Sequence, residues 1–176
     1  MYLDLLSKVL TNKIYEPDSP KATPDEVDEI KKTLDLLMND GINLNISAED
    51  LTQILQYTKR SRNIHTYVSI DALNNIRDAI TITNEKKIVG DVLDCGVLRG
   101  GTSIYMAGVL KSLNSSRKVY VADSFSGLPV PSTQDGIFAN HFWYGFSKAL
   151  PIYNLDCLAS IDDVKENFNR YGLLDD

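Results

Sequence analysis

The chain has 176 residues, a length typical of one domain, and 43% of them are hydrophobic, which is enough for a sizeable core. Its formal net charge is −6 and its basic residues are scattered, which argues against a nucleic-acid partner. The sequence contains no apolar run of membrane-spanning length, so we expect no membrane partner. Two isolated cysteines, Cys95 and Cys157, indicate reduced thiols and a cytoplasmic protein rather than a disulfide framework.

Residues 1–85 have the pattern of an N-terminal helical region. Apolar residues at helical spacing predict a short amphipathic helix within residues 1–10. Residues 15–24 are rich in Pro and polar side chains, so they predict an extended or disordered linker.

Three more helices are predicted after the linker. The first has Thr23 as its cap and Pro24 at its first helical position, and Gly41 is a plausible stop. The second begins at Ser47. The third runs from about Ser69 to residue 80, because its apolar residues recur on one side.

The pattern changes at residue 86, where an α/β core begins. Residues 90–96 form a short apolar run that ends in Gly, which predicts a buried strand. Residues 102–113 predict a helix, and residues 117–125 predict a second strand. A strand, a glycine loop, a helix and a strand in this order form a right-handed βαβ unit, the opening of a parallel sheet.

A long irregular segment, residues 127–158, is typical of a lid over a functional site. Ser160 and Asp163 then predict the capping box of a last helix that ends near Arg170. Two core strands are visible, whereas a doubly wound sheet needs several more. We therefore expect this chain to be an N-terminal portion of a longer protein.

The stretch DCGVLRGGTS, residues 94–103, places three glycines between the first strand and its helix. A nucleotide phosphate loop has the spacing G-x-x-x-x-G-K-[ST], but Thr102 stands where its lysine is needed. A dinucleotide fingerprint, G-x-G-x-x-G, would lack its second glycine here, which weakens that interpretation without excluding it. S-adenosylmethionine has no phosphates and needs no lysine. Asp94 and Asp123, at successive strand ends, are placed to accept from its ammonium and its ribose hydroxyls, although each could instead cap a turn or a helix.

The blocks DVLDCGVLRGGTSIYMAGVL and VYVADSFSGLP together resemble the macrocin O-methyltransferase family. Its members are S-adenosylmethionine-dependent enzymes that methylate sugar hydroxyls of macrolides and related natural products. Residues 2–16, 65–76 and 164–176 extend the resemblance. It implies the first part of an S-adenosylmethionine-type Rossmann sheet, of the doubly wound kind, behind the helical region. It also implies methyl transfer to a hydroxyl of a sugar or natural-product small molecule.

The resemblance also implies the cofactor contacts. Some of these residues shape the glycine loop, some hold the ribose and adenine side, and some approach from the N-terminal helix. The expected contacts are Thr66, Tyr67, Ser69, Asp94, Gly96, Arg99, Gly101, Asp123, Ser124 and Phe125. Asp94 stands where the family usually has Glu, and Arg99 could equally be a structural ion-pair partner.

In the complete enzyme the resemblance implies Mg²⁺ and a base aspartate, at positions that this sequence does not contain. Asp162 and Asp163 fit the first turn of a helix instead. His141, in the long loop, is the one catalytic candidate, and its alternative is a surface or aromatic-packed histidine. The expected partners are a small-molecule hydroxyl acceptor and further copies of the chain. The alternatives are an inactive cofactor-binding module and, less favoured, a nicotinamide- or nucleotide-binding Rossmann protein.

Overall fold

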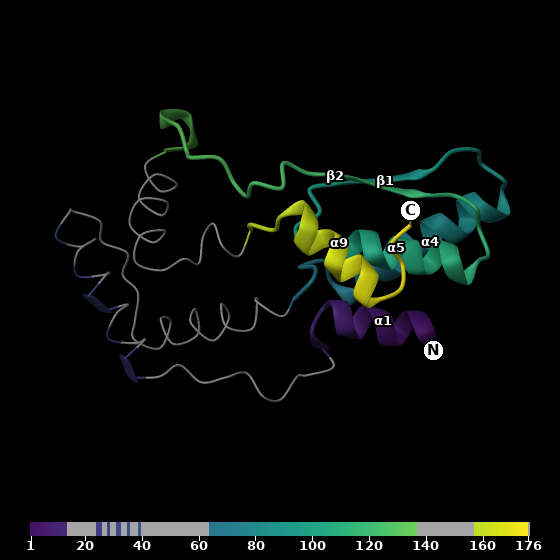
Figure 1. The fold of residues 1–176 in the computed structure, drawn as a ribbon, viewed down its shortest axis with the longest axis horizontal. Helices are drawn as coiled ribbons and strands as arrows, with labels where there is room; N and C mark the ends of the chain where they lie inside the picture. The colour runs from purple at the N-terminus through teal and green to yellow at the C-terminus, as the bar shows by residue number, and fades with distance from the viewer. Residues whose placement is uncertain are drawn as a thin grey trace. The chain divides into compact units, whose positions relative to one another are not determined.

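The computed structural model of the chain describes residues 1–13, 64–136 and 157–175, and single helical residues between 24 and 39. The chain divides into two compact units. The first consists of Met1–Pro17, Ile64–Phe125 and Ala159–Asp176, and the second of Asp18–Asn63 and Ser126–Leu158. The sheet and the helices that surround it belong to the first unit (Figure 1).

The first unit contains the predicted strand–loop–helix–strand order. Its elements are α1 (Tyr2–Leu10), α4 (Ile70–Glu85), β1 (Val92–Cys95), α5 (Gly101–Ser112), β2 (Val119–Ala122) and α9 (Ile161–Arg170). The prediction of a parallel pair is confirmed, because β1 and β2 run side by side in the same direction, with Val92 opposite Val119 and Cys95 opposite Ala122. Figure 1 shows the helices of this unit on one side of the two strands.

The two strands have one packed face and one open face. Val92 and Val121 are half-buried and pack against the core. Leu93 and Tyr120, which point to the opposite face, are 62% and 56% exposed. The prediction of a fully buried strand is therefore wrong for one face, because within the described residues the helices pack on a single side of the sheet.

Helix α5 lies at the centre of the core. Ile104, Tyr105 and Val109 are almost completely buried, because α5 packs against α1, α4 and the strands at once. A helix that is apolar on all sides is typical of such a central position. From α1, Leu6 and Leu10 complete this side of the core. The start of α5, where the glycine loop ends, is therefore held from several directions.

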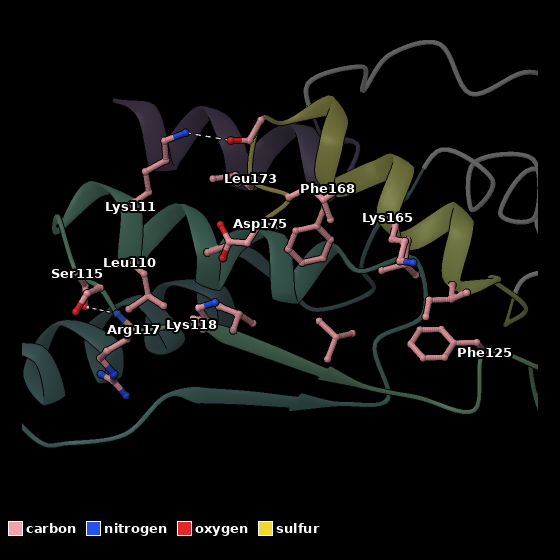
Figure 2. Close-up of a pocket in the computed structure, with 18 residues that line it drawn as sticks. Leu110, Lys111, Ser115, Arg117, Lys118, Phe125, Lys165, Phe168, Leu173 and Asp175 are labelled. Atoms are coloured by element: carbon pink, nitrogen blue, oxygen red, sulfur yellow. Dashed lines mark hydrogen bonds between the residues drawn. The ribbon is translucent and has the colours of Figure 1, made fainter.

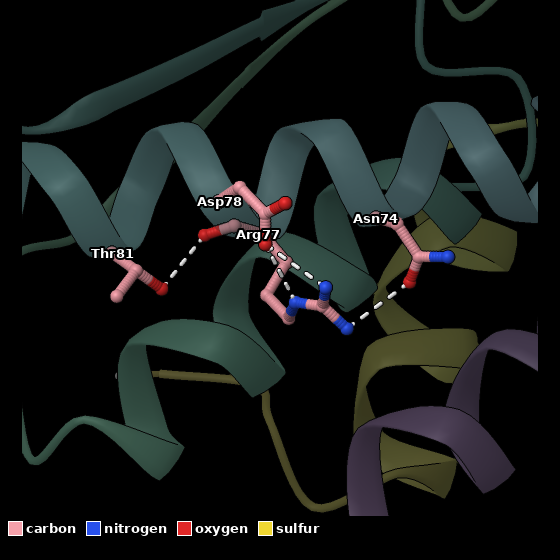
Figure 3. Close-up of polar contacts among 4 residues, drawn as sticks. All are labelled: Asn74, Arg77, Asp78 and Thr81. Carbon is pink, nitrogen blue, oxygen red and sulfur yellow. Dashed lines mark hydrogen bonds and ion pairs between the residues drawn. The ribbon is translucent and has the colours of Figure 1, made fainter.

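Helix α4 begins where it was predicted, after Ser69, but extends beyond its predicted end. The hydroxyl of Ser69 accepts from the N–H of Ala72, as an N-cap should. The helix continues to Glu85, and polar side chains bond within it (Figure 3). Thr81 donates to the carbonyl of Arg77 at 2.8 Å, and the Arg77 guanidinium donates to Asn74 at 3.1 Å.

Helix α9 confirms its predicted capping box. The Ser160 hydroxyl accepts from the N–H of Asp163, and the Asp163 carboxylate accepts from the N–H of Ser160 at 2.8 Å. The Ser160 hydroxyl also donates to the Asp163 carboxylate at 2.7 Å. This bond first, and then the one from the Ser160 N–H, hold the pKa of Asp163 below its ordinary value. Asp162 lies in the first turn of the helix, as predicted.

Parts of the remaining predictions lie outside the described residues. They include the linker up to residue 23, the helix expected from Ser47, and most of the irregular segment, of which residues 127–136, with the short 3-10 helix η2 (Thr133–Asp135), and 157–158 are described. The helix predicted after the linker is supported by its described residues, which are helical and exposed: Pro24, Asp25, Asp28, Lys31, Lys32, Asp35 and Asn39. Among the residues that the structure describes, none of the helices combines the length and apolarity needed to cross a membrane.

Candidate cofactor site

The carboxyl ends of β1 and β2 meet at one edge of the sheet. The N–H of Gly96, just after β1, donates to the carbonyl of Ala122 at 2.9 Å. Asp123 follows β2 directly, and its Oδ2 accepts from the N–H of Val97 at 2.7 Å. Ligands of open α/β sheets bind outside the carboxyl ends of the strands. The glycine loop and Asp123 therefore lie together where a ligand is expected.

The loop between β1 and α5 needs glycine at two positions for different reasons. Gly96 has φ +79° and is exposed, and a Cβ added there would meet nothing within 4 Å. Its backbone is therefore open to the approach of a ligand. Gly100 has φ +81° as the N-cap of α5, and an added Cβ would lie 3.0 Å from Val164 of α9. Glycine adopts such left-handed conformations without steric cost.

Residues 64–66, called the strap here, hold the start of α5. The N–H of Gly101 donates to the carbonyl of His65 at 3.0 Å. A Cβ added to Gly101 would lie 2.5 Å from the carbonyl carbon of His65, so a side chain does not fit there. The strap is in turn tied to α1, because the carbonyl of Leu10 accepts from the N–H groups of His65 and Thr66 at 3.0 and 3.3 Å.

Two further side-chain contacts join the strap to the loop. The hydroxyls of Thr66 and Thr102 lie 2.8 Å apart, and Thr66 is buried. The Arg99 guanidinium donates to the carbonyl of Ile64 at 2.9 Å. From the other side, Asn167 of α9 donates its amide to the carbonyl of Arg99 at 3.0 Å. The loop is thus fixed both by the strap and by α9.

Asp123 is a half-buried carboxylate that binds backbone N–H groups. Burial by itself would raise its pKa, but the N–H groups of Phe125, Val97 and Leu98 and the hydroxyl of Ser124 lower the pKa below the ordinary value overall. The charged form is therefore held in place.

Asp94 is the second carboxylate at this edge. It is half-buried on β1, and its Oδ2 accepts from the hydroxyl of Ser103 in α5 at 2.6 Å. Ser103 is 0% exposed. The two carboxylates follow neighbouring strands, which suits a cofactor with one positive group and one diol.

The N–H groups of the loop are largely used by the protein itself. The N–H groups of four loop residues donate to acceptors within the chain: Gly96, Val97, Gly100 and Gly101. A loop that binds phosphate needs such groups free to point at the anion. The geometry therefore favours a cofactor without phosphates, such as S-adenosylmethionine, over a dinucleotide.

The structure brings most of the predicted contacts to this edge, while Ser69 caps α4 and Tyr67 is 45% exposed. His141 lies outside the described residues. Four residues at the edge were not predicted as site residues: His65, Thr102, Ser103 and Asn167. The hydroxyl pair directly after the glycines was a signal for Thr102 and Ser103, whereas Asn167 carries no local signal.

A cavity of about 750 Å³ lies elsewhere in the same unit, among α5, β2 and α9 (Figure 2). Apolar side chains such as Leu110 and Phe168 line it together with basic ones, and Lys111 donates to the carbonyl of Gly172 at 3.0 Å. Of the predicted cofactor contacts, Phe125 alone lines this cavity. The candidate site therefore rests on the geometry of the loop and not on this cavity.

In the described part of the chain, no three His, Cys, Asp or Glu side chains form a group that could hold a metal ion. The described residues therefore do not supply the ligands for the Mg²⁺ that the resemblance implies for a complete enzyme.

Comparison with known proteins gives one family and several relatives. The family model described as macrocin-O-methyltransferase (TylF) matches residues 1–176. The chain is 32% identical over 177 residues to the 8-demethyl-8-(2,3-dimethoxy-alpha-L-rhamnosyl)-tetracenomycin-C 4'-O-methyltransferase of Streptomyces olivaceus, in an alignment of 100% of this chain with 58% of that protein. It is 31% identical over 182 residues to the mycinamicin III 3''-O-methyltransferase of Micromonospora griseorubida, again over 100% of this chain and 61% of that protein.

A solved structure is similar as well. The O-methyltransferase NovP has a TM-score of 0.61 and 28% sequence identity, and the match covers 99% of this chain and 60% of that one. The chain thus spans about three fifths of the length of the relatives it matches, between 58% and 61%. The similarity to NovP supports the predicted α/β fold.

Proposed function

The chain belongs to the macrocin-O-methyltransferase (TylF) family, and from this we propose that it binds S-adenosylmethionine and serves in methyl transfer to a hydroxyl group. Relatives along the whole chain are named as O-methyltransferases, which supports the reaction class. The observation that carries the choice of cofactor is the loop after β1, whose N–H groups are bound within the protein and whose two neighbouring carboxylates are held in place.

Within this proposal each part of the edge has a role. Asp123 accepts from the ribose hydroxyls, Asp94 accepts from the ammonium, and the open backbone at Gly96 lets the cofactor lie close to the loop. When bound, S-adenosylmethionine supplies a methyl group attached to a positively charged sulfur, and this methyl group can be transferred to an acceptor oxygen. The chain's own contribution is to bind and orient it, and positioning of this kind supplies much of the rate of such reactions. The proposed contacts remain Thr66, Tyr67, Ser69, Asp94, Gly96, Arg99, Gly101, Asp123, Ser124 and Phe125.

We propose a sugar or another natural-product small molecule as the acceptor. Two relatives support this class, because their names specify a position on a glycosylated or macrolide-type product. Within the same proposal the protein self-associates through α1, where Tyr2 and Leu5 are exposed apolar residues, and the low cysteine content supports a cytoplasmic location. Size-exclusion chromatography with light scattering tests the association, and a monomer at all concentrations would contradict it.

Ligand-dependent stabilisation tests the cofactor. We expect S-adenosylhomocysteine to raise the unfolding free energy, by about 2.7 kcal/mol when its concentration is a hundred times its Kd, since it binds the folded state. NAD should leave the stability unchanged. The control variant is Asp162→Asn, which removes an exposed carboxylate of the first turn of α9 and should respond to both ligands as the unmodified chain does. Stabilisation by NAD with none by S-adenosylhomocysteine would refute the proposal in favour of a dinucleotide-binding protein.

A further inference from the structure

We propose that Ser103 is a positioning residue for cofactor binding: its hydroxyl fixes the carboxylate of Asp94 in the orientation that takes the ammonium group of the cofactor. This inference rests on the proposed function, because it concerns how one part of S-adenosylmethionine is recognised. Ser103 contacts Asp94 and acts on the ligand through this carboxylate.

The contact between the two side chains is short and protected. The Ser103 hydroxyl donates to Asp94 Oδ2 at 2.6 Å, within the range of charge-assisted O–H···O⁻ bonds. Ser103 is fully buried at the start of α5, so water does not compete for its hydroxyl. A bond of this kind holds one rotamer of the carboxylate, where a half-buried Asp94 would otherwise rotate about its last torsion.

The hydroxyl of Ser103 is directed toward Asp94 although it has a local alternative. A serine inside a helix commonly donates to the carbonyl four residues earlier, which here belongs to Arg99. That carbonyl already accepts from Asn167 at 3.0 Å. In the structure the Ser103 hydroxyl donates to Asp94 Oδ2 instead.

The second oxygen of Asp94 is available to a ligand. Within the described ranges, the bond from Ser103 is the hydrogen bond that reaches this carboxylate, and it uses Oδ2. Oδ1 thus keeps its lone pairs for a positively charged donor. Asp94 lies near the carboxyl end of β1, beside the start of α5, and this is the edge where the cofactor is proposed to bind.

The test compares two ligands that differ in the amino-acid portion. S-adenosylhomocysteine carries the ammonium group, whereas 5′-methylthioadenosine keeps the nucleoside and lacks the amino acid. Isothermal titration calorimetry of the whole chain with each ligand measures both affinities. We expect Ser103→Ala to weaken binding of S-adenosylhomocysteine about tenfold, since a hydrogen bond that orients a charged group is lost, and to leave the affinity for 5′-methylthioadenosine within about twofold.

Ser112→Ala is the matched control. Ser112 lies in the same helix and its hydroxyl donates to the carbonyl of Val109 at 2.7 Å, away from the loop. This variant should change neither affinity. Ser103→Cys keeps a donor at this position, though a weaker one on a slightly larger side chain, so it should give a smaller loss that is again specific for S-adenosylhomocysteine. If Ser103→Ala does not fold, Ser103→Cys replaces it in the same measurement.

The outcomes distinguish a failure of the role proposed for Ser103 from a failure of the proposed function. Equal weakening of both ligands in the Ser103 variants would mean that Ser103 only supports the fold, and unchanged binding of S-adenosylhomocysteine would mean that it has no role; either result overturns the inference alone. If the unmodified chain binds neither ligand, the proposed function itself fails and the inference falls with it.

Discussion

At the scale of single residues, the four residues of the segment GGTS each have a separate contact. Gly100 turns the chain in the left-handed region, and Gly101 lies against the backbone of the strap. Thr102 contacts the strap through its hydroxyl, and Ser103 reaches the end of β1. One turn of helix therefore positions the loop, the strap and a carboxylate together, so a change at any of the four acts on the whole edge.

Gly101→Ala tests the close approach of the strap. Alanine favours a helix by up to about 1 kcal/mol over glycine, but its Cβ would lie 2.5 Å from the His65 backbone, and overpacking costs about 1–3 kcal/mol. We expect a net loss of stability in urea unfolding, together with weaker binding of S-adenosylhomocysteine. Gly108→Ala in the same helix is the control, since its Cβ meets the flexible end of Leu6 and should cost less. A more stable Gly101→Ala variant would contradict the strap contact.

Asp123 makes stability depend on pH in one direction. Its pKa in the folded chain lies below the ordinary value of 3.8, so the folded state releases this proton more readily than the unfolded state does. The stability that it contributes is complete above the unfolded pKa and is lost as the pH falls through the folded pKa. Asp123→Asn should therefore cost about 1–2 kcal/mol near pH 7, because backbone donors lose an ionised acceptor, and less at pH 3.

Urea unfolding at pH 7, 5 and 3 measures this difference between the two proteins. The exposed Asp162→Asn change controls for the loss of one negative charge, and we expect it to stay within about 0.5 kcal/mol at pH 7. A cost of Asp123→Asn that is equal at all three pH values would mean that the carboxylate is not held by the N–H groups around it.

At the scale of elements, α9 is a second support of the loop beside the strap. Val164 and Phe168 pack against Gly100, and Asn167 donates to the carbonyl of Arg99. We expect Asn167→Ala to reduce stability by about 1 kcal/mol and to weaken binding of S-adenosylhomocysteine severalfold, since the buried carbonyl loses its donor. Asn169→Ala, on the exposed side of the same helix, should have neither effect in thermal shift and calorimetry. Equal effects of both variants would argue against a role of α9 in the loop.

Helix α1 is the other element that supports the loop, through the carbonyl of Leu10. The side chain of Leu10 is 0% exposed, so Leu10→Ala should cost about 3–5 kcal/mol, from lost burial and the cavity that remains. Leu5→Ala removes a half-exposed leucine of the same helix and should cost under about 1 kcal/mol in urea unfolding. A large effect at Leu5 would mean that α1 packs differently.

At the scale of the whole molecule, the local signals predicted most of the described elements. Apolar spacing located α1 and α4, and the capping box located the start of α9, because these signals lie within a few residues of each other in the sequence. The end of α4 was missed, since residues 81–85 have no apolar stripe. The exposed face of the strands was missed because periodicity does not reveal which faces are covered.

The site was predicted in part, for the same reason. Asp94, Gly96 and Asp123 stand next to strand ends and were found from their position, whereas Asn167 was not. Its contact to Arg99 joins residues that lie 68 positions apart in the sequence. Contacts of this kind depend on how the elements pack, and no local pattern carries them.

The strap also determines when the glycine loop can be completed during synthesis of the chain. The carbonyl of Leu10 leaves the ribosome long before its partner His65, and the N–H of Gly101 follows later still. Closing such distant contacts costs loop entropy, and favourable contacts compensate this cost only when all three segments are present. Helix α1 is therefore the first described element to be made and among the last to be held in place, and a nascent chain shorter than about a hundred residues has no strap closed over the start of α5.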